Sequence, residues 1–287
     1  MGLFLYPVKH HLFYKACFLI GWKSKSQVLA KLSTFSLLIE LCDPYWSRIL
    51  SAKFRYEIEV EYCIKKLMDK YDLAFVDCGA NIGYWTMFVG SSCRNLQLIC
   101  VEPNPEMNHF LNLNLAINKL EAKVFESAIG RTISKSTNSY IDFYQKNSRG
   151  GHAGSGIIPG EYGVAKIIRI PFKSLDEILC SISQKSARIL VKLDVEGVEL
   201  ECMRNLSPTF FRQTLFLYED HGKDPLCKPT KWLLESKKYQ IFFLTKNGFM
   251  QIVSIDQLRK LKRNRKKGYN ILAVPESKYF RDFAEIV

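Results

Sequence analysis

Short apolar runs that end in an acidic residue recur along this chain. Four of them close on Asp77, Glu102, Asp194 and Glu219, and apolar positions at helical spacing lie between them. Such runs are typical of strands buried on both faces, and strands that alternate with helices pair in parallel through right-handed crossovers. The pattern therefore predicts a doubly wound α/β fold with a mostly parallel sheet, whose carboxyl edge gathers these acids.

Strands and helices can be placed along most of the chain. We expect strands at residues 73–77, 98–102, 123–128, 140–144, 165–171, 188–194, 215–219, 239–244 and 270–274. Helices are expected at residues 56–71, from 82 onward, and at 105–119, 174–179, 198–204 and 231–238. No clear helix separates the last two strands, which suggests that they pair antiparallel at the sheet edge. Ser174 and Glu177 have the spacing of a capping box.

The N-terminal part of the chain differs from the rest. The first 52 residues read as helical but irregular, with a break at Asp43-Pro44. We therefore expect an N-terminal helical extension over residues 1–55 and a single catalytic or binding domain over residues 56–287.

The charge of the chain is unusually positive. Among 287 residues, 47% are hydrophobic and 24% charged, and the formal net charge is +13. Residues 259–267 carry seven cations in nine residues. Such a run can bind phosphate-rich partners or make a peripheral contact with an anionic membrane; the alternative is a solvated loop. No aromatic residue interleaves with these cations, so the run does not indicate a stacking platform for single-stranded nucleic acid.

The cysteines and the N-terminal residues indicate in which cellular compartment the protein is expected. The nine cysteines are scattered and form no Cys-x-x-Cys pair, which favours thiols in a reducing compartment over a zinc site or disulfide framework. Pro7, Lys9 and Lys15 interrupt the apolar N-terminal stretch, so it lacks the core of a secretory signal and the length of a membrane span. We expect a cytoplasmic protein without a transmembrane segment.

A glycine loop and a distant acid point to a cofactor. The first strand runs through Asp77 into Gly79-Ala80-Asn81-Ile82-Gly83, and Glu102 ends the next strand 25 residues beyond Asp77. Ligands of open α/β sheets bind at the carboxyl ends of the strands, and an acid at about 20 residues past the glycine loop can hold ribose hydroxyls. The spacing indicates a nucleotide-type cofactor.

The motifs of this chain resemble those of the FkbM-type class I S-adenosylmethionine-dependent methyltransferases. The matching stretches are Val76 to Tyr84, Val101 to Pro105 with Asn112, Asn114 and Asn118 after it, Ser174 to Asp176, Val191 to Glu199, and Gly268 to Pro275. The block from Lys192 to Glu199 is similar to the Lys-x-Asp-x-Glu-Gly-x-Glu signature of that family. The resemblance covers about residues 56–275.

The resemblance implies a seven-stranded sheet that binds S-adenosylmethionine and transfers its methyl group to a hydroxyl of a carbohydrate or secondary metabolite. The implied cofactor residues are Asp77, Gly79, Asn81 and Gly83 beside the methionine and ribose, Glu102 on the ribose hydroxyls, Ser127 and Ala128 near the adenine, and Tyr84 closing over the cofactor. One departure is Cys78, where small aliphatic residues are more usual.

Methyl transfer to a hydroxyl requires in-line positioning and a base for the proton. The candidate catalytic residues lie in or just past strand ends and are Lys192, Asp194, Glu196, Glu219 and His221. Lys192 and Asp194 are two residues apart, so they project to the same side of their strand and can form a couple. The alternative is that Lys192 is merely paired and Asp194 caps the following helix. His152, in a glycine-rich loop, is a further candidate for the base.

Other interpretations remain open. Asp194, Glu196, Glu219, Asp220 and His221 can be ligands of a divalent metal that binds a substrate diol. A nicotinamide-dependent oxidoreductase would share the glycine loop, but this loop reads Gly-x-Asn-x-Gly and the block from Lys192 to Glu199 would have no role. A non-enzyme alternative is a basic protein that binds RNA or an anionic polymer on a methyltransferase scaffold. We expect acceptor selection, for a hydroxylated small molecule or glycan, in residues 131–168.

Overall fold

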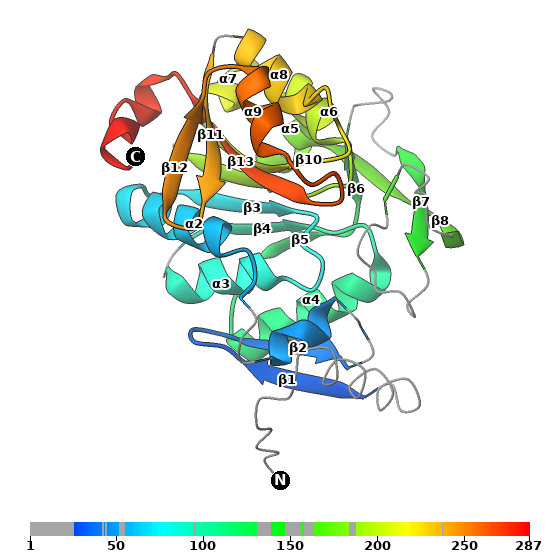
Figure 1. The fold of residues 1–287 in the computed structure, drawn as a ribbon. Helices are drawn as coiled ribbons and strands as arrows, with labels where there is room; N and C mark the ends of the chain where they lie inside the picture. The colour runs from blue at the N-terminus through cyan, green and yellow to red at the C-terminus, as the bar shows by residue number, and fades with distance from the viewer. Residues whose placement is uncertain are drawn as a thin grey trace.

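The computed structural model describes residues 26–41, 43, 45–51, 55–93, 96–130, 139–146, 156–157, 164–183, 188–236 and 238–287. Its centre is an eight-stranded sheet in the order β12-β11-β13-β10-β9-β3-β4-β5 (Figure 1). The strands are β3 (Ala74–Cys78), β4 (Leu98–Val101), β5 (Lys123–Phe125), β9 (Ile189–Leu193), β10 (Thr214–His221), β11 (Tyr239–Thr245), β12 (Gly248–Ile252) and β13 (Gly268–Pro275). The doubly wound α/β fold is confirmed.

Pairing in this sheet is mostly parallel. β5, β4, β3, β9 and β10 are parallel neighbours, whereas β13 runs antiparallel between β10 and β11. The predicted antiparallel pairing of the last two predicted strands is thus confirmed, but two parts of that prediction are wrong. A strand, β12, and a helix, Ile255–Leu261, separate the two strands in sequence, and β12 forms the sheet edge. The sheet has one strand more than the seven implied, because residues after β11 turn back at Lys246–Asn247 and form β12.

Helices cover both faces of the sheet (Figure 1). One face packs against α2 (Ile58–Lys70), α3 (Tyr84–Ser92) and α4 (Pro105–Asn118), and the other against α5 (Leu175–Leu179), α6 (Glu199–Arg204), α7 (Pro208–Gln213), α8 (Lys228–Glu235) and α9 (Ile255–Leu261). Side chains of the strands alternate between the two cores: Phe75 belongs to the first, and Val76 and Cys78 to the second. Short 3₁₀ turns η3 (Lys278–Phe280) and η4 (Phe283–Glu285) follow β13, and Phe280 and Phe283 pack in the first core.

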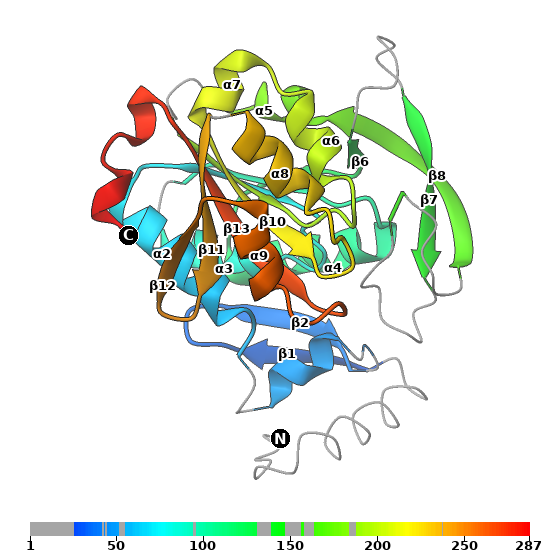
Figure 2. The ribbon, with the colours of Figure 1, turned by 45° about the horizontal axis from the view of Figure 1, so that its top comes forward.

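The predicted third strand is divided between two sheets. Lys123 to Phe125 form β5, whereas β6 (Ala128–Gly130) pairs with β8 (Val164–Ser174) in a three-stranded sheet completed by β7 (Tyr140–Lys146). β7 and β8 extend from the side of the central sheet (Figure 2). Ser174 ends β8 and caps α5 in the predicted capping box with Glu177.

The prediction of a helical N-terminal extension is wrong for the described residues 27–40. They form a hairpin of β1 (Gln27–Lys31) and β2 (Ser36–Glu40), and the 3₁₀ turn η1 (Trp46–Leu50) follows. The reason is a two-residue period: Leu37 and Ile39 are fully buried, whereas Ser36, Leu38 and Glu40 are half-buried.

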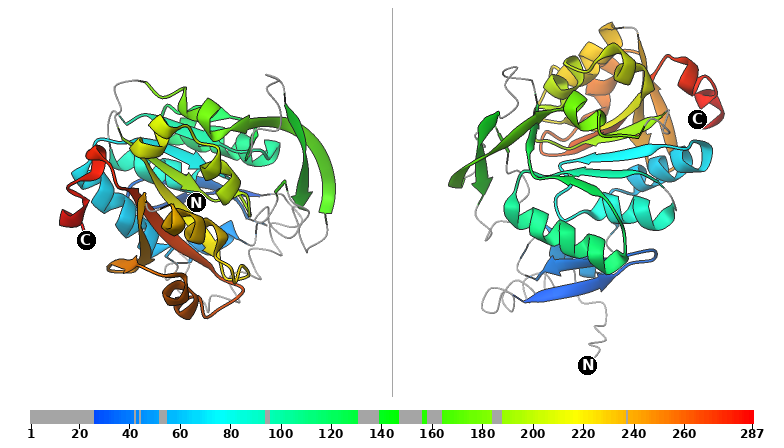
Figure 3. Two further views of the ribbon diagram at one scale, coloured as in Figure 1. Left: turned by 90° about the horizontal axis from the view of Figure 1, so that it is seen from above. Right: turned by 180° about the vertical axis from the view of Figure 1, so that it is seen from behind.

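Two asparagines of α4 hold this hairpin. Asn114 Oδ1 accepts from the Leu38 amide at 2.6 Å, and its Nδ2 donates to the carbonyls of Leu38 at 3.2 Å and Ile82 at 2.9 Å. Asn118 makes the equivalent pair of bonds to Ser36, at 2.8 and 2.7 Å. The hairpin therefore lies across α4 on the side away from the sheet (Figure 3, right).

No helix within the described ranges combines the length and the apolar composition that crossing a bilayer requires. The cysteines that the structure describes are free thiols, and they are Cys63, Cys78, Cys93, Cys100, Cys180, Cys202 and Cys227.

Candidate functional site

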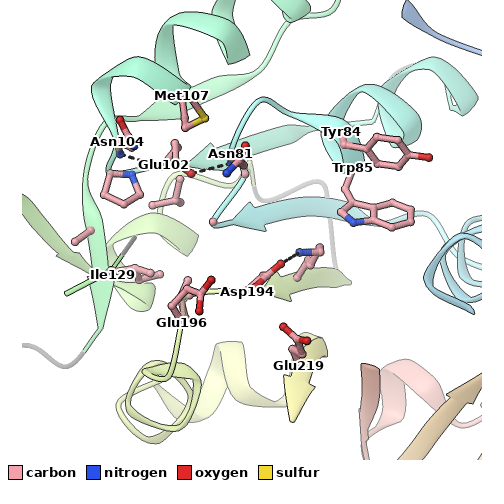
Figure 4. Close-up of a pocket in the computed structure, with 18 of the residues that line it drawn as sticks. Asn81, Tyr84, Trp85, Glu102, Asn104, Met107, Ile129, Asp194, Glu196 and Glu219 are labelled. Carbon is pink, nitrogen blue, oxygen red and sulfur yellow. Dashed lines mark hydrogen bonds and ion pairs between the residues drawn. The ribbon is translucent and has the colours of Figure 1, made fainter. Parts of the chain in front are cut away.

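A cavity of about 260 Å³ opens at the carboxyl end of β3, where the strand order reverses because β4 lies on one side of β3 and β9 on the other. Such a reversal is where open α/β sheets bind ligands. The cavity brings together nine of the predicted residues, namely Gly79, Asn81, Tyr84, Glu102, Ala128, Lys192, Asp194, Glu196 and Glu219. They come from five different segments of the chain, as Figure 4 shows for most of them.

The glycines of the loop allow close backbone contact. Gly79 has a φ of 81°, and a Cβ there would lie 2.0 Å from the carbonyl oxygen of Asp194. Gly83 has a φ of 89°, and a Cβ there would lie 2.6 Å from Leu111 Cδ1 of α4. Gly79 therefore lets β3 and β9 meet beneath the cavity, whereas Gly83 serves helix packing and does not line the cavity.

Glu102 is fixed by two backbone amides. Its Oε2 accepts from the Asn81 amide at 2.7 Å and its Oε1 from the Asn104 amide at 2.8 Å. Burial raises the pKa of Glu102 to about 7, although both amide donors oppose the shift. Glu102 lies just past the end of β4, so its carboxylate reaches the cavity with a second lone pair on each oxygen free for a ligand hydroxyl.

The indole of Trp46 completes this side of the cavity. Its Nε1 donates to Asn81 Oδ1 at 2.8 Å, and the same oxygen accepts from the Ile82 amide at 2.9 Å. These bonds hold Asn81 in its left-handed conformation, φ 53°. The ring of Trp46 stacks on Tyr84 with centroids 5.9 Å apart. Tyr84 thus lines the cavity as part of an aromatic wall.

Lys192 and Asp194 form the predicted couple, with Nζ and Oδ2 3.0 Å apart. Burial alone would lower the pKa of Lys192, but the carboxylates of Asp194, Asp77 and Glu57 outweigh it and raise the pKa above its usual value. Lys192 therefore stays charged and is a donor rather than a base. Asp194 does not cap the next helix, because α6 begins at Glu199 with Val198 as its N-cap.

The carboxyl group of Glu219 has a raised pKa. Burial, together with the negative charges of Asp194 and Glu57, raises the pKa of Glu219 to about 8. Glu57, at the start of α2, lines the same part of the cavity and accepts from Trp85 Nε1 at 3.2 Å. Its own pKa is raised to about 6 by burial.

The segment after Asp194 is a tight turn. Glu196 has a φ of 55° and Gly197 a φ of 101°, and the buried Glu199 accepts from the amides of Val195 at 3.3 Å and Gly197 at 3.1 Å. These bonds shape the loop, and the Glu196 side chain reaches the cavity (Figure 4).

Four predicted residues do not line the cavity: Asp77, Gly83, Ser127 and His221. Asp77 is only 1% exposed and accepts from Thr86 Oγ1 at 2.8 Å, because β3 continues to Cys78 and turns the Asp77 side chain toward α3. Ser127 is buried just before β6. His221 Nδ1 lies 3.9 Å from Glu219 Oε2, behind that carboxylate. His152 and most of residues 131–168 lie outside the described residues.

Asp220 is turned away from the cavity. It follows Glu219 on β10, so its side chain projects to the opposite face, where it accepts from Thr230 Oγ1 at 2.6 Å and from Lys262 Nζ. Asp220 therefore does not join Asp194, Glu196 and Glu219 in the five-residue metal site considered from the sequence. Within the described ranges, no three His, Cys, Asp or Glu side chains are grouped as metal ligands.

Several residues that line the cavity were not predicted from the sequence. They are Tyr45, Trp46, Tyr56, Glu57, Trp85, Asn104, Met107, Ile129, Phe143 and Val198. Asn104, in Glu102-Pro103-Asn104-Pro105, could have been found as the N-cap of α4, since its side chain accepts from the Glu106 amide. The aromatic residues before α2 carry no local signal, because only the docked hairpin brings them to the cavity.

Comparisons with known proteins match this chain to methyltransferases. A model described as the methyltransferase FkbM domain matches residues 77–270. The methyltransferase sdnD of Sordaria araneosa is 27% identical over 187 residues, which are 55% of this chain and 70% of that protein.

Solved structures also align over most of the chain. A putative caffeoyl-CoA O-methyltransferase of Staphylococcus aureus has 11% identity and a TM-score of 0.44, over 80% of this chain and 89% of that one. The precorrin-6y C5,15-methyltransferase of Geobacter metallireducens has 14% identity and a TM-score of 0.40, over 79% and 92%. The FkbM match spans more than half of the chain, and this protein therefore belongs to the FkbM family of methyltransferases.

Proposed function

We propose that this protein is an S-adenosylmethionine-dependent O-methyltransferase that acts on a hydroxyl of a carbohydrate or a similar hydroxylated metabolite. The observation that carries the proposal is one cavity with two differently equipped ends. Glu102, Asn104 and Met107 lie on one side of Asp194, and Glu219 lies on the other (Figure 4). The first end suits the cofactor and the second the acceptor.

The residues present fit S-adenosylmethionine. Five carboxylates line the cavity, from Glu57, Glu102, Asp194, Glu196 and Glu219, and Lys192 is the one cation among the described lining residues. This excess of negative charge suits a ligand that carries a sulfonium and an ammonium group. Glu102 would accept the ribose hydroxyls, and the apolar side chains of Met107, Ile129 and Phe143 would pack on the adenine.

When bound, S-adenosylmethionine supplies an electrophilic methyl group. Transfer of that group to a hydroxyl, giving a methyl ether and S-adenosylhomocysteine, releases the hydroxyl proton, and Glu219 would accept this proton. A base with a pKa near the working pH is the most effective, and the pKa of Glu219 is raised to about 8. Lys192 and Asp194, held together at 3.0 Å, position the acceptor oxygen.

The aromatic wall of the cavity favours a neutral ring as the acceptor. Tyr45, Trp46, Tyr56 and Trp85 line the cavity beside Glu57. Aromatic faces pack against the apolar faces of sugar or metabolite rings, while the carboxylates accept from their hydroxyls. An acceptor with its own negative charge would be repelled by the carboxylates of Glu57 and Asp194.

The test is to incubate the protein with methyl-labelled S-adenosylmethionine and separated glycan, metabolite, lipid, protein and RNA fractions of its source cell. We expect label in a hydroxylated glycan or metabolite, with the label in an acid-stable O-methyl ether by mass spectrometry. Label confined to protein or RNA, or found on nitrogen, would contradict the proposal. Asp194→Asn serves as the control that separates enzymatic from chemical methylation.

A further inference from the structure

The basic run of the sequence lies next to the cavity. Residues 259–267 comprise the end of α9 and the connection into β13. The Gly222 amide donates to the Lys267 carbonyl at 2.9 Å, and a Cβ on Gly222 would lie 2.2 Å from the Asn264 carbonyl oxygen. This connection therefore packs on the turn that follows β10 (Figure 2). Gly222 in that turn is three residues beyond Glu219, which lines the cavity.

One lysine of the run, Lys262, is buried and holds the connection in place. Lys262 is 9% exposed, and its Nζ donates to Asp220 Oδ1 and, at 2.9 Å, to the Asp224 carbonyl. Cys227 Sγ lies 3.4 Å from the same nitrogen. A paired, buried cation is costly to displace, so it fixes the position of the connection on the protein surface.

Three other cations of the run are exposed to solvent. Arg263, Arg265 and Lys266 are exposed, and none makes an ion pair with an acid in the described ranges. Lys223 and Lys228 add exposed positive charges on the turn after β10. Exposed like charges on one surface repel one another, and an anionic partner would relieve this repulsion.

An apolar residue projects among these cations. Leu226 is 51% exposed on the turn between Lys223 and Lys228. Asp224 fixes this turn, because its two carboxylate oxygens accept from the amides of Leu226 at 2.9 Å and Lys228 at 2.7 Å. Both carboxylate oxygens of Asp224 are thereby hydrogen-bonded within the turn.

We propose that this basic edge, made of Lys223, Leu226, Lys228, Arg263, Arg265 and Lys266, docks on the surface of an anionic lipid bilayer. Each Lys or Arg near an anionic membrane contributes to binding, and an inserted apolar side chain adds the second signal that stable attachment requires. Single-stranded nucleic acid is disfavoured as the partner, because Tyr269, whose hydroxyl bonds to the Asn264 amide, is buried and cannot stack on a base.

Docking in this way would bring the Glu219 end of the cavity close to the membrane. The bilayer would then be where this enzyme meets its acceptor, a statement that rests on the proposed O-methyltransferase function. The binding itself does not depend on that function, and it can be measured without any acceptor.

The test is binding of the full chain to phosphatidylcholine vesicles with and without phosphatidylserine, by cosedimentation. The test variant is Arg263→Gln, Arg265→Gln, Lys266→Gln. Its matched control is Lys123→Gln, Lys238→Gln, Lys278→Gln, which removes three exposed cations from the opposite edge of the sheet. We expect the test variant to bind phosphatidylserine vesicles about 100-fold more weakly than wild type, and the control variant to bind like wild type.

The variant Leu226→Ser distinguishes binding to a bilayer from binding to other polyanions. We expect it to weaken vesicle binding about tenfold and to leave binding to a short RNA or to heparin unchanged. The proposal is overturned by an equal loss in both triple variants, by failure of the wild type to prefer phosphatidylserine vesicles, or by binding to RNA alone. S-adenosylhomocysteine affinity, measured on the same samples, reports on the proposed enzyme function separately.

Discussion

The side chain of Glu219 occupies the space that a Cβ on Gly268 would fill: such an atom would lie 0.8 Å from Oε1 and 2.5 Å from the Glu219 Cγ. The two residues come from neighbouring antiparallel strands, because Glu219 pairs with Asn270 and His221 with Gly268. The missing side chain at position 268 is what allows Glu219 to lie along β13 and face Asp194.

The first prediction concerns this contact. Gly268→Ala should force Glu219 into another rotamer and lower kcat/KM about 100-fold, since a positioned general base contributes at least that much. Affinity for S-adenosylhomocysteine, measured by calorimetry, should not change. Gly248→Ala is the control, because an added Cβ there meets nothing within 4 Å. Wild-type activity in Gly268→Ala would argue against Glu219 as the base.

The second prediction concerns pH. Burial and the neighbouring Asp194 and Glu57 raise the pKa of Glu219 to about 8, so below that pH the carboxyl is mostly protonated and cannot accept a proton. Activity should therefore increase as the pH rises and level off above about 8, in contrast to the flat profile that an ordinary carboxylate would give there. Initial rates at saturating cofactor across this window provide the profile. A rate that falls with rising pH would exclude a base of this kind.

The third prediction tests the role of Trp46. Trp46→Phe keeps a ring beside Tyr84 but removes the bond from Nε1 to Asn81 Oδ1. Loss of one hydrogen bond costs about 1 kcal/mol, so S-adenosylhomocysteine should bind about fivefold more weakly. Trp232→Phe, on the opposite face of the sheet, should bind like wild type. Equal affinities in the two variants would show that the indole does not organise the cofactor loop.

The fourth prediction tests how the hairpin is attached. Asn114→Ala leaves the Leu38 amide and the carbonyls of Leu38 and Ile82 without their side-chain partner. We expect a loss of about 2–3 kcal/mol in the free energy of unfolding, because buried polar groups without partners are costly. The control is Asn112→Ala, since the exposed Asn112 bonds only to the Asn108 carbonyl. Similar urea midpoints for both variants would refute this account of the attachment.

The central part of the fold was predictable because its strands are buried on both faces. Continuous apolar runs at β3, β4, β9 and β10 leave little choice of structure, and acids at strand ends mark the ligand edge. The prediction that Asp77 lines the cofactor site failed, because the exact end of a strand decides which way a side chain points. Asp77 is followed by one more strand residue and turns toward α3, whereas Glu102 lies past its strand and reaches the cavity.

The rest of the site depends on contacts between segments far apart in sequence. Leu37 and Ile39 alternate with half-buried neighbours over a span too short to separate a strand from a helix by periodicity. Trp46 reaches the cavity only because Asn114 and Asn118 hold the hairpin on α4. These hydrogen bonds join residues that are far apart in sequence, so no local pattern around Trp46 predicts them.

The central claim is that Glu219 removes the proton of an acceptor hydroxyl beside a cofactor held by Glu102. The most direct test is single-turnover methyl transfer from labelled S-adenosylmethionine by wild type and Glu219→Gln, with the cofactor dissociation constant measured for both. We predict that Glu219→Gln transfers methyl between about 10² and 10⁴ times more slowly and binds the cofactor as wild type does. Methyl transfer at the wild-type rate by Glu219→Gln would contradict this account.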